Sequence, residues 1–236
     1  MFIGMGMPLP DLSNLPGASR PGGGGGGPSG PSVDQIANQY SFEFDRATAT
    51  YMTTGINIAT SSNFSVSFWV KGGVKAGFTN NNAFGIGGGG NTTPGRLWNN
   101  KFIIQSLDNT GANFANRVID IDIYDGNWHH LVFTRDNSTG QYFAYTAGAN
   151  IQWTGIYGAN NAPSITLNPS GDLYLGTAGG SATYSFDGKV DEFALFDRVL
   201  QEEEIKAIYD ATTAGKTADL STLSTGAPTA WYRMGD

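Results

Sequence analysis

The sequence contains no cysteine, which excludes both a disulfide and a thiolate metal site. Small secreted animal domains usually carry disulfides, so this absence favours folding in a reducing cytosol. The chain also has no run of the roughly 20 apolar residues that a membrane-spanning helix needs. Its first residues show neither a basic region nor an apolar stretch of signal-peptide length. We therefore expect a soluble protein that is not inserted in a membrane and does not follow the standard secretion route.

Charge is scarce as well: 14% of the residues are charged, and the formal net charge is −7. The few Lys and Arg residues form no basic stripe, so no nucleic-acid partner is expected. Glycine is abundant instead, with 34 of 236 residues, and 12% of the chain is aromatic. This composition predicts short strands joined by turns, and the length suits one all-β domain with a tail.

Residues 1–32 differ from the rest because they hold six of the ten prolines and the glycine run Gly22 to Gly27. Such a segment cannot bury enough apolar surface to fold alone. It is either a flexible leader or an arm that becomes ordered against other subunits. The arm is favoured by apolar side chains that a solvated tail does not need: Met1, Phe2, Ile3, Met5, Met7, Leu12 and Leu15. We therefore divide the chain into an arm, 1–32, and a folded domain, 33–236.

From residue 38 onward the hydrophobic period becomes two, which is typical of half-buried strands. Gly, Asn and Asp clusters separate the strands, as in a sandwich or barrel. One helix is expected over 200–211, with acidic residues in its first turn and Gly215 as its stop. Strands are expected at 40–45, 64–70, 119–124, 128–135, 142–146, 173–176, 190–196 and 229–234.

Three stretches, in this order, resemble the laminin-G-like branch of the concanavalin-A-like lectin and glucanase fold. They are Asn63-Phe-Ser-Val-Ser-Phe-Trp-Val70, the Trp-His-His segment Gly126–Asp136, and Phe186–Leu200 followed by Glu203-Glu-Ile205. The resemblance covers residues from about 38 to 212. It implies an all-β, antiparallel jelly-roll β-sandwich with one short helix near the C-terminus.

Glucanases of this fold use two carboxylates about 5–5.5 Å apart when they retain configuration. The nearest match here is Asp120-Ile-Asp-Ile-Tyr-Asp125, which has no glutamate, so no catalysis is expected. The two histidines, His129 and His130, are strand neighbours that point to opposite faces and cannot chelate one ion. We expect one of them to pack inward with a hydrogen bond and the other to face outward.

The resemblance also implies a structural calcium ion, held by Glu43, Asp45 and Asp191. The alternative is that Asp191 and its neighbours Asp187 and Glu192 are turn and surface carboxylates. Apart from this calcium ion, no cofactor is expected.

A glycan site would need an exposed aromatic residue with amides or charges on neighbouring loops. The loop over 78–100 offers Asn81, Arg96 and Trp98, and the loop over 153–163 offers Tyr157 and Asn160. The alternative is that Trp98, like Trp153, is a core or interface residue.

The glycine-rich arm and the ending Ala230–Asp236 resemble those of bacteriophage virion proteins. This second resemblance implies a non-enzymatic virion appendage or tail fibre, assembled in the host cytoplasm and anchored to other virion proteins through residues 1–32. Its sandwich would touch a host-surface glycan, and the chain would be a homo-oligomer, with a trimer as the usual state of a fibre. The alternative is a free carbohydrate-binding module or bacterial adhesin, at the cell surface or outside the cell.

Overall fold

The computed structural model describes residues 30–56, 63–73, 81–86, 95–98, 101–107, 114–119, 121–139, 141–151, 155–158, 172–177, 180 and 182–233. The predicted arm residues Met1, Phe2, Ile3, Leu12 and Leu15 lie outside these ranges. Residues 30–32, predicted to end the arm, are described and contact the folded domain. The Ser32 N–H donates to Ser224 Oγ at 3.0 Å, and the Ser224 N–H donates to the Ser32 carbonyl at 2.9 Å.

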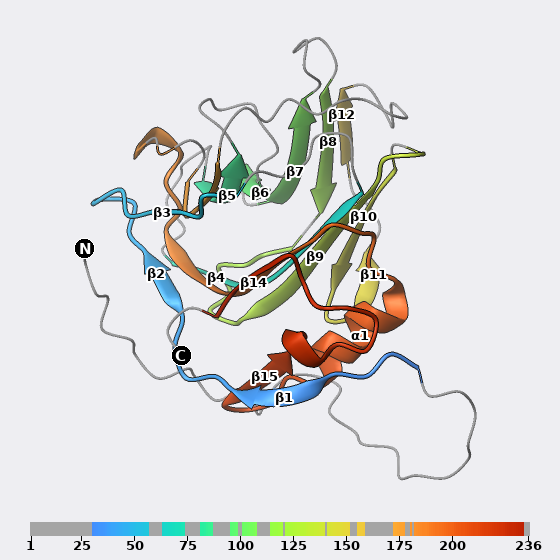
Figure 1. The fold of residues 1–236 in the computed structure, drawn as a ribbon. Coiled ribbons are helices and arrows are strands. Elements are labelled where there is room, and N and C mark those ends of the chain that lie inside the picture. Colours follow the sequence, from blue (N-terminus) through green and yellow to red (C-terminus); the bar gives the residue numbers. More distant parts are fainter. Residues whose placement is uncertain are drawn as a thin grey trace.

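Two antiparallel seven-stranded sheets face each other (Figure 1). The first sheet runs in the order β11 (Ala149–Ile151), β10 (Gln141–Thr146), β9 (His129–Asp136), β4 (Phe64–Gly72) and β14 (Gly188–Phe196), with β2 (Phe42–Phe44) and β16 (Ala230–Tyr232) both paired to β14. The second runs β12 (Gly155–Gly158), β8 (Phe114–Ile119), β7 (Lys101–Leu107), β6 (Gly95–Trp98), β5 (Asn81–Ile86), β13 (Leu173–Leu175) and β3 (Met52–Thr53). The predicted all-β sandwich is confirmed.

The core between the sheets is aromatic and aliphatic. Phe68 of β4 lies 5.4 Å from Phe84, 6.2 Å from Phe133 and 5.8 Å from Phe193, measured between ring centroids. All four rings are buried, and each contributes roughly 1.5–3 kcal/mol by leaving water. The predicted alternation of β4 is confirmed, because Phe64, Val66, Phe68 and Val70 all belong to this core.

The opposite face of the first sheet is buried too, which the alternation did not predict. Helix α1 (Glu202–Asp210) and the two-stranded pair β1 (Asp34–Ala37) and β15 (Lys216–Asp219) lie over it (Figure 1). The apolar residues of this outer layer are Val132, Tyr145, Ala194, Phe196, Leu200, Ile205, Ile208, Ala218, Leu220 and Leu223. Strands β4, β9 and β14 are therefore enclosed on both sides.

Helix α1 agrees with its predicted position. Its start is fixed by Glu204, whose Oε2 accepts a hydrogen bond from the Gln201 N–H at 2.8 Å. Its end is not fixed by Gly215, as predicted, because the C-cap residue Ala211 keeps right-handed backbone angles. Gly215, with φ +72°, lies instead in the turn that leads into β15. No helix among the described residues is long and apolar enough to cross a bilayer.

Two strand predictions are wrong in part. The strand expected at 119–124 does not form: β8 ends at Ile119, and residues 123–127 form a turn and bend in which Asp122 Oδ1 accepts the Tyr124 N–H at 3.0 Å. Tyr40 and Phe42 were expected on a half-buried strand, but they are 40% and 39% exposed. The reason is that β2 is a three-residue edge strand, of which Phe44 alone is buried.

Candidate ligand-binding site

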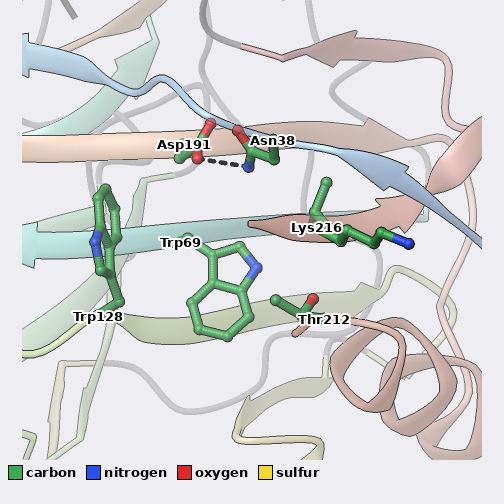
Figure 2. Close-up of a pocket in the computed structure, with 7 residues that line it drawn as sticks. Asn38, Trp69, Trp128, Asp191, Thr212 and Lys216 are labelled. Atoms are coloured by element: carbon green, nitrogen blue, oxygen red, sulfur yellow. Dashed lines mark hydrogen bonds between the residues drawn. The ribbon is translucent and has the colours of Figure 1, made fainter. Parts of the chain in front are cut away.

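A pocket lies on the outer face of the first sheet, beside the β1–β15 pair (Figure 2). The space inside it is about 20 Å³, which is enough for about one water molecule. One wall comes from the sheet and the other from the segments around β1 and β15. The lining residues are Asn38, Trp69, Trp128, Asp191, Thr212, Lys216 and Thr217.

Asp191 lies in this pocket directly before a β-bulge in β14. The pairing with β4 shifts register between Asp191 and Ala194, and Glu192 has a φ of +49°. The extra residue lets Val190 and Phe193 both face the inner core while Asp191 faces outward. A left-handed backbone costs a residue such as glutamate about 1–3 kcal/mol, and such strain gathers at functional sites.

Asp191 and Asn38 are joined inside the pocket. The Asn38 Nδ2 donates to Asp191 Oδ2 at 2.8 Å, and the Glu192 N–H donates to Asp191 Oδ1 at 2.8 Å. Asn38 follows β1, and its own N–H donates to the Gly215 carbonyl at 3.0 Å. Through these two hydrogen bonds, Asn38 links the β1–β15 pair to the sheet at the pocket. Both Asn38 and Asp191 are at least 95% buried.

Two buried polar atoms of the pocket lack a hydrogen-bond partner among the described residues. They are Asn38 Oδ1, an acceptor, and Trp128 Nε1, a donor. A buried polar group without a partner costs about 1–3 kcal/mol. One unmet acceptor and one unmet donor in the same small pocket therefore point to a ligand or a water that supplies the missing partners.

Trp69 forms the aromatic centre of the pocket. Figure 2 shows its indole between Trp128 and Thr212, with the Asp191–Asn38 pair on one side. A stack behind it fixes its orientation, because Trp69 lies 5.1 Å from His130 and 5.9 Å from Tyr209 of α1, between ring centroids. The indole is thus held in place before any ligand arrives.

The two histidines behave as predicted. His130 is buried and shares a 3.0 Å hydrogen bond with Ser67 Oγ, and His129 Nε2 lies 2.9 Å from Asp125 Oδ1 near the surface. Burial lowers the pKa of His130 to about 3, which keeps it neutral at physiological pH. Burial acts to raise the pKa of Asp125, but hydrogen bonds from His129 and Asn127 outweigh it and lower that pKa. His130 is therefore a structural residue behind Trp69.

The predicted glycan residues do not share one loop. Asn81 and Arg96 lie on β5 and β6, paired neighbours in the second sheet, and Trp98 ends β6. Segment 78–100 was expected to be a loop because its Asn residues indicated turns, but residues 81–86 and 95–98 within it are strands. Tyr157 lies on β12, three strands from β6, or roughly 14 Å away. Asn160 lies outside the described residues, and a glycan role for this set stays a prediction.

The predicted calcium ligands are not brought together. Glu43 Oε2 lies 3.7 Å from Lys189 Nζ, and Asp45 Oδ1 accepts the Ala47 N–H of a turn at 2.8 Å. Asp191 lies on the outer face, directly before the bulge, and bonds Asn38. In the described part of the chain, no three His, Cys, Asp or Glu side chains form a group that could hold a metal ion. These three carboxylates therefore do not form one site.

Sequence reasoning missed the pocket itself. Asn38, Trp69 and Trp128 come from three distant segments, and Asn38 belongs to a region without a clear hydrophobic period. One signal was present: Trp69 shares the polar face of β4 with Ser65 and Ser67. A large aromatic side chain on such a face indicates that another element shields it from water. Helix α1 and the β1–β15 pair do so.

The family follows from comparison with known proteins. The family model of the concanavalin A-like lectin/glucanases superfamily, of laminin G type, matches residues 45–206. The chain belongs to this superfamily. It is a lectin-like β-sandwich, as the three sequence stretches implied. The matched range includes Trp69, Trp128 and Asp191 of the pocket and leaves out Asn38 and 212–217.

Individual relatives are more distant. Human neuronal pentraxin-2 is 28% identical over 156 residues, which cover 64% of this chain and 34% of the relative. The chain thus spans about a third of the length of the curated relatives it matches. The botulinum neurotoxin serotype G binding domain has a TM-score of 0.56 at 17% identity, covering 76% of this chain and 45% of that one. A Bacteroides ovatus protein assigned to carbohydrate binding has a TM-score of 0.51 at 17% identity, covering 87% and 53%. These structural likenesses show the shared fold.

Proposed function

We propose that this chain is a non-enzymatic carbohydrate-binding domain that binds a sugar at the mouth of its outer pocket. The observation that carries the proposal is the pocket's unmet donor and acceptor beside the fixed indole of Trp69. Sugars carry hydrogen-bonding groups of both kinds, and their C–H groups pack against aromatic rings. Membership of a lectin superfamily supports this chemistry.

The absence of catalysis is part of the proposal. In the segment nearest to a glucanase signature, Asp122 and Asp125 are engaged in turns, accepting the backbone N–H of Tyr124 and of Asn127. A carboxylate that holds a turn in this way is poorly placed to act as a nucleophile or an acid. We expect no release of reducing ends when the purified chain is incubated with glycans that it binds, and steady release would overturn this part.

The binding proposal is tested by a glycan array on the purified full chain and on a Thr212→Phe variant. Thr212 is half-buried in the pocket wall, so a phenyl ring there should fill the pocket and reduce binding at least tenfold. Thr48→Phe is the matched control, because Thr48 lies in an exposed turn and does not line the pocket. Binding that survives Thr212→Phe would remove the pocket from the proposal, and binding of no glycan would refute the proposal.

The virion role and the homo-oligomer remain predictions that rest on residues 1–32. The relatives described above are not virion proteins. Light scattering on the full chain and on a chain without residues 1–29 tests the arm. The deletion should end before residue 30, because Ser32 bonds to Ser224 in the folded domain. A full-length oligomer that becomes a monomer on deletion would support the arm, whereas two monomers would count against it.

A further inference from the structure

The outer face of the second sheet carries two neighbouring tyrosine rings. Leu173 and Leu175 of β13 are buried in the core, so Tyr174 between them faces outward. Met52 packs against the core at the start of β3, and Tyr51 before it lies on the outer side with Tyr174. The two ring centroids are 6.0 Å apart, and the ring planes are inclined at 59°. These two rings are called the tyrosine pair below.

The tyrosine pair is open to solvent. Tyr51 is 48% exposed, more than any other large hydrophobic residue in the described part of the chain. Tyr174 pairs with Gly85 of β5, which has no side chain to stand beside the ring. A Cβ at Gly180 would lie 3.4 Å from Tyr51 Oη and 3.7 Å from Tyr174 Cε1, so glycine leaves this edge of both rings uncovered. Helix α1 and the β1–β15 pair cover the first sheet instead (Figure 1).

The turn before Tyr51 fixes the backbone that carries its ring. The Thr50 N–H donates to the Asp45 carbonyl at 3.1 Å, and the Asp45 N–H donates to Thr50 Oγ1 at 2.6 Å. Arg46 of the same turn donates from its guanidinium to the Ser185 carbonyl at 3.0 Å. A backbone that is held in this way loses little conformational entropy when a ligand binds.

The chemistry around the tyrosine pair favours a neutral sugar ring. Aromatic faces pack against the C–H groups of a sugar. The exposed residues Tyr51 and Thr53, of which Thr53 pairs directly with Tyr174, offer hydroxyl groups that can donate and accept hydrogen bonds. A net charge of −7 and the exposed Asp45 in the preceding turn disfavour a phosphate or a carboxylate. Two rings are also far too small for a protein partner, which buries roughly 800 Å² on each side.

We propose that the tyrosine pair is a second sugar-binding site, on the opposite side of the sandwich from the outer pocket. A neutral hexose ring stacks on Tyr51, and Tyr174 bounds it on one side. The inference rests on the proposed carbohydrate binding of the chain but not on the outer pocket. An open surface encloses little of its ligand, so we expect an affinity on the order of millimolar.

The test is an NMR titration of the full chain, labelled with ¹³C in its ten tyrosine rings, with lactose and with cellotetraose. The signal absent from Tyr51→Phe identifies Tyr51, and that absent from Tyr174→Phe identifies Tyr174. We expect both signals to shift saturably with at least one of the two sugars. Tyr51→Ser removes the stacking ring and should weaken binding about fivefold, measured at the Tyr174 signal. Tyr51→Phe keeps the ring and should stay within about twofold of the unmodified chain.

Tyr40→Ser is the matched control, because Tyr40 is 40% exposed and lies just before β2 of the first sheet. It should leave the affinity for both sugars unchanged. The charged probe 3′-sialyllactose should bind no more tightly than lactose, since the surroundings of the tyrosine pair are acidic.

The possible failures are distinguishable. If neither lactose nor cellotetraose shifts the Tyr51 and Tyr174 signals, the second site is refuted and the proposed function stands. Equal weakening by Tyr51→Ser and Tyr40→Ser would also refute it, and tighter binding of 3′-sialyllactose than of lactose would overturn the neutral ligand class. The proposed function is refuted by an empty glycan array, which is a separate measurement.

Discussion

The two faces of the first sheet differ in what they bury. The inner face packs Phe68, Phe133 and Phe193 against the second sheet and is mostly apolar, although Arg135 is also buried on it. The outer face buries Ser67, His130 and Asp191 beneath α1 and the β1–β15 pair. The inner face therefore stabilises the fold mainly through its buried apolar area. On the outer face, each buried polar atom also needs a hydrogen-bond partner. Among the described residues, Trp128 Nε1 on the outer face lacks such a partner.

The largest effect should come from the inner face. Phe68→Ala should lower the free energy of unfolding by about 3–5 kcal/mol, because it leaves a cavity among packed rings. Ser67→Ala, one residue away on the outer face, should cost about 1 kcal/mol through its lost hydrogen bond to His130. Urea denaturation measures both. Similar costs for the two variants would contradict the contrast between the faces.

Acid should weaken the outer face selectively. The pKa of His130 is about 3 in the folded chain, below its unfolded value of 6.5, so the unfolded chain binds more protons between these pH values. The contribution of His130 to the free energy of unfolding is therefore complete above pH 6.5. It falls by about 1.4 kcal/mol for each pH unit as the pH drops toward 3.

His130→Gln tests this dependence, because glutamine can keep a bond to Ser67 and does not titrate. Between pH 7.5 and pH 5, the unmodified chain should lose about 2 kcal/mol more than the variant, measured by urea denaturation at each pH. Equal losses would show that His130 is not the acid-sensitive group.

A small gain is expected at the turn between β10 and β11, which lies beside helix α1. Ala147 has a φ of +49° and precedes Gly148, with φ +75°. Asparagine tolerates this conformation better than alanine, so Ala147→Asn should stabilise the chain by about 0.5–1 kcal/mol. Thermal unfolding would show a rise of a few degrees, and a fall would mean that the turn is not strained.

The same contrast explains what the sequence could predict. The alternation of β4 and the spacing of Leu200, Ile205 and Ile208 in α1 each report one apolar face, and both were correctly assigned. Strands β1 and β15 were missed, because each has four residues and its partner lies about 180 positions away. The pocket depends on that pairing, because it brings Asn38 next to Asp191. A contact between such distant residues cannot be predicted from a local sequence pattern.

The most direct measurement is a titration of the ¹⁵N-labelled chain with a glycan that binds on the array, observed at the five tryptophan indole N–H signals. The signal absent from Trp128→Phe identifies Trp128, and that absent from Trp231→Phe identifies Trp231. We predict that the Trp128 signal moves downfield with a saturable dependence on the sugar, as its N–H gains an acceptor, while the Trp231 signal stays in place. A sugar that binds without moving the Trp128 signal would contradict the assignment of the ligand to the outer face.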